Sequence, residues 1–202
     1  DGCPYTVSTM SHLNVKIASC VGGGPMERLV KCLRGTGADA RVFEGMGPAQ
    51  WRYLMSSGRA GRLRARADAL LRFPIDVLRK SVFGAGEIWV PTTNPFILPW
   101  LMVMTQPLHG RMVVPLIYDL YPDAFEAADM DGQLGPLAPL AAEMNRQLFA
   151  RADGVVFIGQ RMADHVARKY GEPKRWTVIE TGAEASEFSP AKLGDMAPET
   201  AL

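Results

Sequence analysis

The sequence predicts an α/β protein, built as a three-layer sandwich in which helices cover both faces of a mostly parallel sheet. Short apolar segments alternate repeatedly with longer helical segments along the chain. The apolar segments lack the polar alternation of a strand with one solvated face. Hydrophobic residues make up 48% of the 202 residues and charged residues 21%, which suffices for one substantial core. We therefore expect one domain over residues 1–190.

The first half of the chain contains three expected strands, at residues 5–10, 39–44 and 88–90. Residues 11–24 are expected to form a loop that ends in glycines. A helix then begins at Pro25, which suits a first turn, and ends near Gly35. A longer helical region at 48–82 is expected to break near residues 56–58 and again at Pro74.

The second half repeats the pattern, with strands expected at residues 112–118, 154–158 and 176–179. Helices are expected at 134–152 and 160–170. Asn94 is expected to cap a further helix that begins at Pro95, because asparagine suits the cap and proline the first turn. Pro115 lacks a backbone N–H and is awkward in a central strand, but apolar residues on both sides of it favour one continuous strand.

The charge balance argues against a dedicated nucleic-acid binder, because 22 basic and 21 acidic residues leave a net charge of only +1. The basic residues gather between Trp51 and Lys80, where seven arginines and Lys80 are opposed by two aspartates. Two interpretations of this segment stay open. It is either a helix whose arginines simply lie in water, or a surface that rests on an anionic membrane beside apolar residues such as Leu70 and Phe73.

The cysteines are Cys3, Cys20 and Cys32. Their odd number and the lack of a C-x-x-C pair predict neither a disulfide framework nor a zinc site. The sequence contains no cluster of metal ligands, and its most apolar run, residues 96–104, is too short to span a bilayer. We expect a reduced, cytoplasmic protein without metal or cofactor. If the membrane interpretation of the arginine-rich segment holds, the protein would lie peripherally at the inner face of the membrane.

Two segments carry candidate site residues. Gly22, Gly23 and Gly24 precede the helix at Pro25, where glycine lets the backbone approach a ligand and the helix N-terminus offers N–H groups to an anion. Tyr118 and Asp119 follow the strand at 112–118, and ligands of open α/β sheets bind at the carboxyl ends of strands. For both segments a purely structural role, as a tight turn or a cap before a proline, stays open.

These segments form part of an ordered set that includes Ala152-Asp153 at a strand entry and Thr181-Gly182-Ala183-Glu184 followed by Phe188 and Pro190. The set resembles the acceptor-binding domain of GT-B glycosyltransferases, in the large retaining family that includes sucrose synthase and many cell-envelope sugar transferases. The resemblance covers nearly the whole chain. The departures are Tyr118 where many members have His, Thr181 in place of Asn and Glu184 in place of Asp.

The resemblance implies a Rossmann-like N-terminal half of a GT-B fold that uses a nucleotide sugar as substrate and a glycan or lipid-linked acceptor. It implies that residues 22–24 face the donor diphosphate and that Tyr118 and Asp119 lie near the point of sugar transfer. The acceptor side of the cleft is expected to contain Asn94, Thr181, Gly182 and Glu184. Residues 191–202 are expected to begin a linker to a donor-binding domain that is not in this sequence, so the isolated half is expected to be inactive.

Two other functions are alternatives to a glycosyltransferase. An NAD-dependent oxidoreductase is disfavoured because the glycines lack the G-x-G-x-x-G order and Glu44 alone would have to bind the ribose. A non-catalytic glycosyltransferase-like subunit, which pairs with a separate donor-binding partner, stays open as the alternative.

Overall fold

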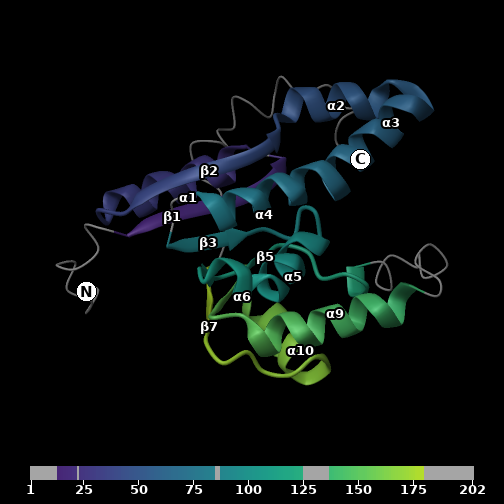
Figure 1. Ribbon diagram of the computed structural model, residues 1–202. Coiled ribbons are helices and arrows are strands. Elements are labelled where there is room, and N and C mark those ends of the chain that lie inside the picture. The colour runs from purple at the N-terminus through teal and green to yellow at the C-terminus, as the bar shows by residue number, and fades with distance from the viewer. Residues whose placement is uncertain (1–12, 22, 85–86, 125–136, 180–202) are drawn as a thin grey trace, which may run out of the picture.

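Parallel strands run through the middle of the protein, with helices packed on both sides (Figure 1). The computed structural model describes residues 13–21, 23–84, 87–124 and 137–179. The strands are β1 (Asn14–Val21), β2 (Asp39–Met46), β3 (Ile88–Pro91), β4 (Met112–Val113), β5 (Leu116–Ile117), β6 (Val155–Phe157) and β7 (Trp176–Val178). The helices are α1 (Gly24–Gly35), α2 (Pro48–Ser56), α3 (Gly58–Ala67), α4 (Phe73–Phe83), α5 (Ile97–Met104), α6 (Gln106–His109), α9 (Ala138–Arg151) and α10 (Gln160–Lys169). A π-helical turn, Asp68–Arg72, joins α3 to α4.

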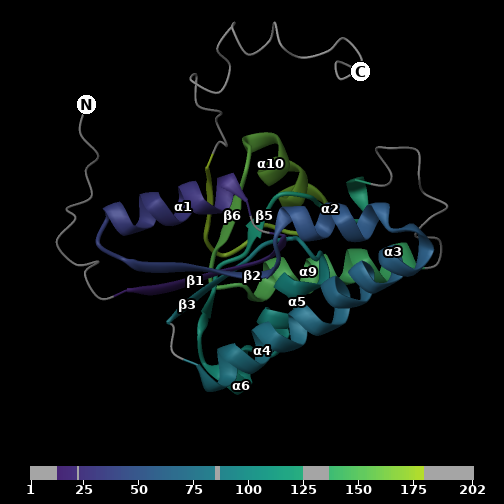
Figure 2. The same ribbon diagram turned by 90° about the horizontal axis from the view of Figure 1, so that it is seen from above.

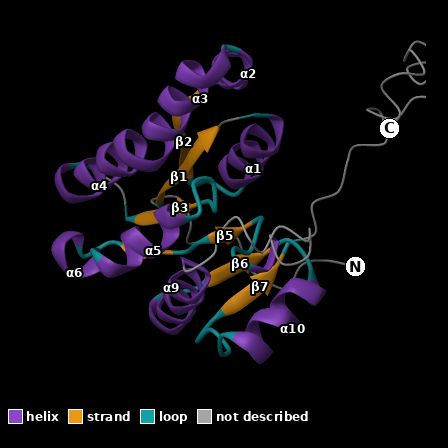
Figure 3. Ribbon diagram, turned by 90° about the vertical axis from the view of Figure 1, so that its right-hand side faces the viewer, coloured by secondary structure: helices purple, strands orange, loops and turns teal. Residues whose placement is uncertain are grey.

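The strands form two sheets, ordered β2-β1-β3-β4 and β5-β6-β7, and every strand pair is parallel. A parallel bridge between Thr92 and Leu116 connects the two sheets, so the strands make one continuous layer. Helices α1 and α10 lie on one side of this layer, and α4, α5, α6 and α9 lie on the other (Figure 3). The expected three-layer sandwich with a parallel sheet is confirmed.

Two apolar clusters fill the space between the layers. One surrounds Val15 and Ile17 of β1 and includes Met26 and Val30 of α1. The other is larger, contains the fully buried Trp89 and includes side chains of α4, α5, α9 and α10. Burial on both faces explains why β3, β5 and β6 consist of apolar residues without polar alternation.

The first strand differs from its prediction. Residues 5–10 lie outside the described residues, and the expected loop at 11–24 contains β1, the longest central strand. Lys16 and Ser19 interrupt its apolar pattern, so the segment does not stand out in the sequence. Pairing with β2 on one side and β3 on the other outweighs this weak local preference.

Proline 115 divides the expected strand at 112–118 into β4 and β5. The segment lies between β3 and β6, and the Pro115 carbonyl still accepts a hydrogen bond from the Val156 N–H at 2.8 Å. The ring nitrogen has no hydrogen to donate, so the ladder is interrupted at this one residue. The apolar residues on both sides of Pro115 do form strands, as predicted, but they form two short strands and not one continuous strand.

The helix after β3 begins at Ile97 and not at Pro95, so the predicted cap at Asn94 is wrong. The Asn94 carbonyl accepts a hydrogen bond from the Cys20 N–H at 2.8 Å. This bond continues the contact between β3 and β1 and keeps residue 94 at the edge of the sheet. Asn94 therefore lies in the loop after β3, beside the end of β1.

The helical region expected at 48–82 is confirmed, with its first break at Ser57–Gly58, where Gly58 has φ 73°. The second break is not at Pro74 itself but in the π-helical turn before it. Proline cannot donate to the carbonyl four residues back and its ring crowds that carbonyl, and the wider turn relieves the conflict. Helices α3 and α4 therefore run in line along one side of the molecule (Figure 2).

No helix within the described ranges is both long enough and apolar enough to cross a bilayer.

Candidate functional site

The connections of the sheet define where a ligand would bind. From β1 the chain passes to β2 on one side and then crosses to β3 on the other side. The carboxyl ends of β1 and β3 therefore mark the point where the strand order reverses, which is where open α/β sheets bind ligands. The bond from Cys20 N to Asn94 O joins these two strand ends.

The glycine loop lies at the end of β1 and leads into α1. Gly23 is the N-cap residue, with φ 157° and ψ −178°, and no side chain caps the helix. The Gly23 carbonyl accepts the N–H groups of Met26 and Glu27 at 3.0 and 3.2 Å. A helix N-terminus without a capping side chain is suited to an anion, whose oxygens can take the place of the cap. Gly22 lies outside the described residues.

Arg28 lies one turn into α1 and was not predicted. Its Nη1 atom is 3.7 Å from the position that a Cβ atom on Gly24 would occupy, so the guanidinium lies over the glycine loop. Burial raises the pKa of the Tyr118 phenol, and the positive charge of Arg28 opposes that rise. Arg28 therefore places a cation beside the glycine loop, close enough to Tyr118 for its charge to act on the phenol. A basic residue one turn after a glycine run is the signal that could have identified it.

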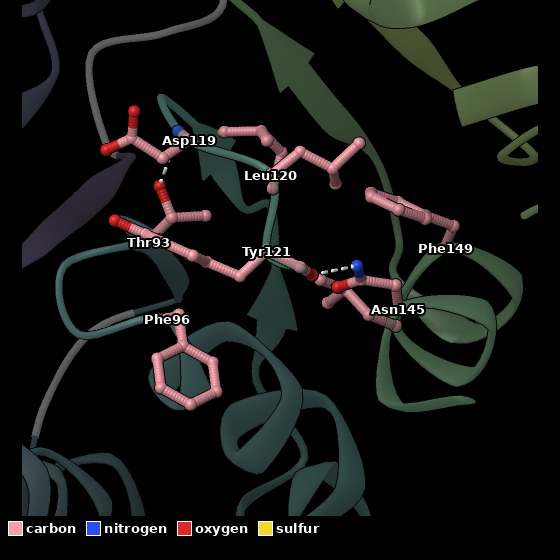
Figure 4. A pocket seen from close by; sticks show the side chains of 9 residues that line it. Thr93, Phe96, Asp119, Leu120, Tyr121, Asn145 and Phe149 are labelled. Atoms are coloured by element: carbon pink, nitrogen blue, oxygen red, sulfur yellow. Dashed lines mark hydrogen bonds between the residues drawn. The ribbon is translucent and has the colours of Figure 1, made fainter. Parts of the chain in front are cut away.

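Thr93 connects the loop after β3 to the loop after β5 and was also not predicted. Its Oγ1 atom accepts hydrogen bonds from the backbone N–H groups of Tyr118 and Asp119, each at 3.1 Å, and the second bond is drawn in Figure 4. Thr93 is buried, with 8% of its surface exposed. The hydroxyl thus holds the backbone of the two candidate catalytic residues against the neighbouring strand end. We call this pair of hydrogen bonds the Thr93 clamp.

A small pocket lies beside this clamp, between the two loops and α9 (Figure 4). Asp119 is exposed and contributes to its wall, together with Phe96 and Tyr121, whose rings pack 5.7 Å apart. Asn145 of α9 donates a hydrogen bond to the Tyr121 carbonyl at 2.5 Å and closes the far side. Burial and the charge of Asp119 both raise the pKa of Tyr121.

The structure brings most of the described site residues to one edge. Gly23 and Gly24 follow β1, Asn94 follows β3, and Tyr118 and Asp119 follow β5. The side chains of Asn94 and Asp119 are exposed, whereas Tyr118 is half-buried. The remaining predicted residues, Gly22, Thr181, Gly182 and Glu184, lie outside the described residues.

A second hollow lies at the same edge, at the ends of β1 and β2, and no sequence pattern pointed to it. It is a cleft of about 220 Å³ between β2, α2, the π-helical turn and α4. Its polar walls contain Glu44, Asp68, Arg72 and Asp76. Within the described residues, none of these four side chains makes a hydrogen bond or an ion pair to another protein group. Their polar atoms are therefore available to a ligand.

The apolar side of this cleft depends on Gly45. A Cβ atom at that position would lie 2.7 Å from Cδ2 of Phe73 and 3.1 Å from the Cys20 carbonyl oxygen. The Phe73 ring is stacked on Phe43, with ring centres 5.7 Å apart and planes 14° from parallel. Only a glycine leaves room for this ring, so the shape of the cleft is built into the end of β2.

A parallel sheet covered on both faces, with a glycine loop and an uncapped helix at its crossover point, defines a Rossmann-like domain, which is the arrangement expected of one half of a GT-B fold. The family model for the glycosyl transferase 4-like domain matches residues 25–182. That range is most of the chain and contains Arg28, Thr93, Tyr118 and Asp119, and the chain belongs to this family. A search of curated proteins found no match.

Proposed function

We propose that this chain forms the acceptor-side lobe of a glycosyltransferase that moves a sugar from a nucleotide sugar to a glycan or lipid-linked acceptor. The observation that carries the proposal is the grouping of an uncapped helix N-terminus, a cation and two polar side chains on adjacent strand ends. Membership of the glycosyl transferase 4-like family supports the reaction class. The lobe that binds the nucleotide is proposed to be separate from the domain described here, so the isolated chain is expected to be inactive.

The glycine loop is proposed to face the diphosphate of the donor. During transfer the bond between the anomeric carbon and the diphosphate breaks, and negative charge collects on the leaving diphosphate. The oxygen of an acceptor hydroxyl bonds to that carbon, and the proton of this hydroxyl passes to the leaving diphosphate. The N-terminus of α1 carries partial positive charge, and Arg28 adds a full positive charge over Gly24. Both would interact more strongly with the leaving group than with the intact donor, which is the condition for catalysis.

Tyr118 and Asp119 are proposed to act on the sugar side of the site. A phenol whose pKa is raised by burial stays protonated at neutral pH, so Tyr118 donates a hydrogen bond and does not act as a base. Asp119 is exposed and can accept a hydrogen bond from a hydroxyl group of a substrate. The Thr93 clamp holds the backbone of both residues and limits the freedom of their side chains.

The second cleft is proposed to receive the acceptor. Carboxylates accept hydrogen bonds from sugar hydroxyls, and Glu44, Asp68 and Asp76 offer three of them beside Arg72. The cleft opens at the same edge as the glycine loop, because β1 contributes to both. A glycan acceptor is thus supported by the unpaired polar side chains of the cleft.

Replacing Arg28 by Gln in the complete two-lobe enzyme tests the donor side of this proposal. Loss of a charge-assisted hydrogen bond of about 1.5–3 kcal/mol should lower kcat/KM about tenfold to a hundredfold. Lys31, an exposed residue on the same helix, provides the matched control as Lys31→Gln. In the same assay Tyr118→Phe should lower kcat.

Equal kcat/KM values for the Arg28 and Lys31 variants would remove Arg28 from the site. A complete wild-type enzyme that binds a nucleotide sugar but transfers nothing to any glycan or lipid-linked acceptor would favour the alternative, a non-catalytic subunit.

A further inference from the structure

Helix α3, the π-helical turn and α4 follow one another without a gap and together form one rod, residues 58–83. The outer face of this rod presents a row of exposed apolar side chains. Leu63, Leu71 and Ile75 have exposed fractions of 71%, 63% and 61%. The opposite face of the rod is buried and consists of Ala65, Ala69, Phe73, Val77 and Ser81. The buried residues repeat every four positions and supply the contacts of the rod with the core. The exposed apolar residues on the outer face therefore take no part in the core.

The π-helical turn keeps both rows straight. Residues four apart on an α-helix drift by about 40° around the axis at each step, so such a row would wind around the helix. The wider turn at Asp68–Arg72 takes more residues per turn and reverses the drift midway. Leu63 therefore stays on the same side as Leu71 and Ile75, over about 18 Å of helix.

Arginines surround this apolar row. Arg52 of α2 and the rod residues Arg59, Arg62, Arg64, Arg66 and Arg79 are all exposed. Within the described ranges, none of these six guanidinium groups makes an ion pair or a side-chain hydrogen bond. The nearby acids Asp68 and Asp76 are half-buried in the cleft wall and do not lie in the row. The face thus combines apolar side chains with charge of one sign.

We propose that this face, which extends from Tyr53 to Phe83, docks on the surface of an anionic lipid bilayer. Leu63, Leu71 and Ile75 enter the boundary between headgroups and acyl chains, and the arginines bind lipid phosphates. Tyr53 and Phe83, 71% and 85% exposed, extend the contact at its two ends. A nucleic acid would use the arginines but would leave the apolar row in water, and that row therefore favours a bilayer.

Docking in this way also orients the acceptor cleft. Asp68, Arg72 and Asp76 line the cleft from the same rod that carries the outer row. The cleft therefore opens beside the membrane plane, within reach of a headgroup attached to a lipid. This orientation rests on the proposed function, whereas the docking itself does not, because vesicle binding can be measured without any activity.

Flotation of the purified protein with vesicles tests the docking. Vesicles of phosphatidylcholine with about one-third phosphatidylglycerol should bind the protein, and pure phosphatidylcholine vesicles should bind it far more weakly. Arg59→Gln together with Arg66→Gln should lower the partition coefficient about thirtyfold, from the usual contribution of each basic residue near an anionic surface. Arg168→Gln together with Arg175→Gln, which removes two exposed arginines elsewhere, should leave it nearly unchanged.

The apolar row has its own pair of variants. Leu63→Ser, Leu71→Ser and Ile75→Ser combined should abolish flotation, whereas Leu140→Ser with Ile179→Ser should not, although these side chains are 58% and 47% exposed. Circular dichroism would verify that every variant is folded. Equal binding to neutral and anionic vesicles would overturn the proposal. So would wild-type flotation by the apolar-row variant, or a dimer in solution that the same variant dissociates.

Discussion

The smallest residue of the cleft between β2 and α4 sets its shape. Gly45→Ala would place a methyl group 2.7 Å from the buried Phe73 ring, so the ring and its stacking partner Phe43 must move. We expect a loss of about 1–3 kcal/mol in unfolding free energy, the usual effect of overpacking. Chemical denaturation checks this, with Gly35→Ala as control because nothing lies within 4 Å of a Cβ atom there. Equal stability of the two variants would contradict the packing argument.

Asp123 holds the chain after Tyr121 onto α10. It bonds to His165 Nε2 and Lys169 Nζ, each at 2.7 Å, and to the Tyr170 hydroxyl. Burial alone would raise the pKa of Asp123, but these hydrogen bonds outweigh burial and lower it. Burial and the hydrogen bond to Asp123 in turn raise the pKa of Tyr170 to about 12.

Asp123→Asn should lower stability by about 1–2 kcal/mol at neutral pH. A carboxyl whose pKa is lower in the folded state stabilises the fold fully above its ordinary range and loses that contribution as the pH falls through the folded pKa. The difference in Tm between wild type and variant should therefore be largest near neutrality and shrink below about pH 4. A difference that stays constant from neutral to acidic pH would show that the carboxylate charge is not involved.

At this scale the sequence could predict that Gly23, Tyr118 and Asp119 lie at the ends of strands, because each directly follows an apolar segment or precedes a helix. Their part in a site stays a prediction. It could not predict Arg28 or Thr93. Their roles depend on contacts between segments that the order of the strands brings together, and no spacing along the chain encodes that order.

Between elements, one hydroxyl connects the end of β3 to the end of β5. Thr93→Val keeps the volume of the side chain but leaves the N–H groups of Tyr118 and Asp119 without their acceptor. We expect a loss of about 1–3 kcal/mol in stability and lower turnover of the complete enzyme. Thr92→Val is the matched control, because the Thr92 hydroxyl makes only a 3.5 Å contact to the Asn94 carbonyl. Similar effects from both variants would contradict the clamp.

Most elements could be predicted because their apolar runs are long and end at glycine or proline. The exceptions have physical causes. Polar Lys16 and Ser19 concealed β1, Pro115 interrupted a strand without ending it, and sheet contacts held Asn94 away from the helix that it seemed suited to cap. In each case contacts between distant segments outweighed local preference.

For the molecule as a whole, the sequence predicted helices on both sides of a parallel sheet. Strands that are buried on both faces consist of continuous apolar residues, and such runs can be recognised in a sequence. It did not predict the crossover from β2 to β3 or the cleft at the end of β2. The cleft is formed by a helix that lies more than twenty residues after Glu44 in the chain. Its carboxylates are scattered in the sequence and carry no motif.

The π-helical turn at Asp68–Arg72 determines how α3 is rotated about the helix axis relative to α4. Removing one residue from it would rotate everything before the deletion by about 100° relative to everything after it. Ala65 could then no longer face the core while Phe73 and Val77 did so, and Leu63 would leave the line of Ile75. The length of this turn is therefore as constrained as any buried side chain, although Leu70 and Leu71 within it are exposed.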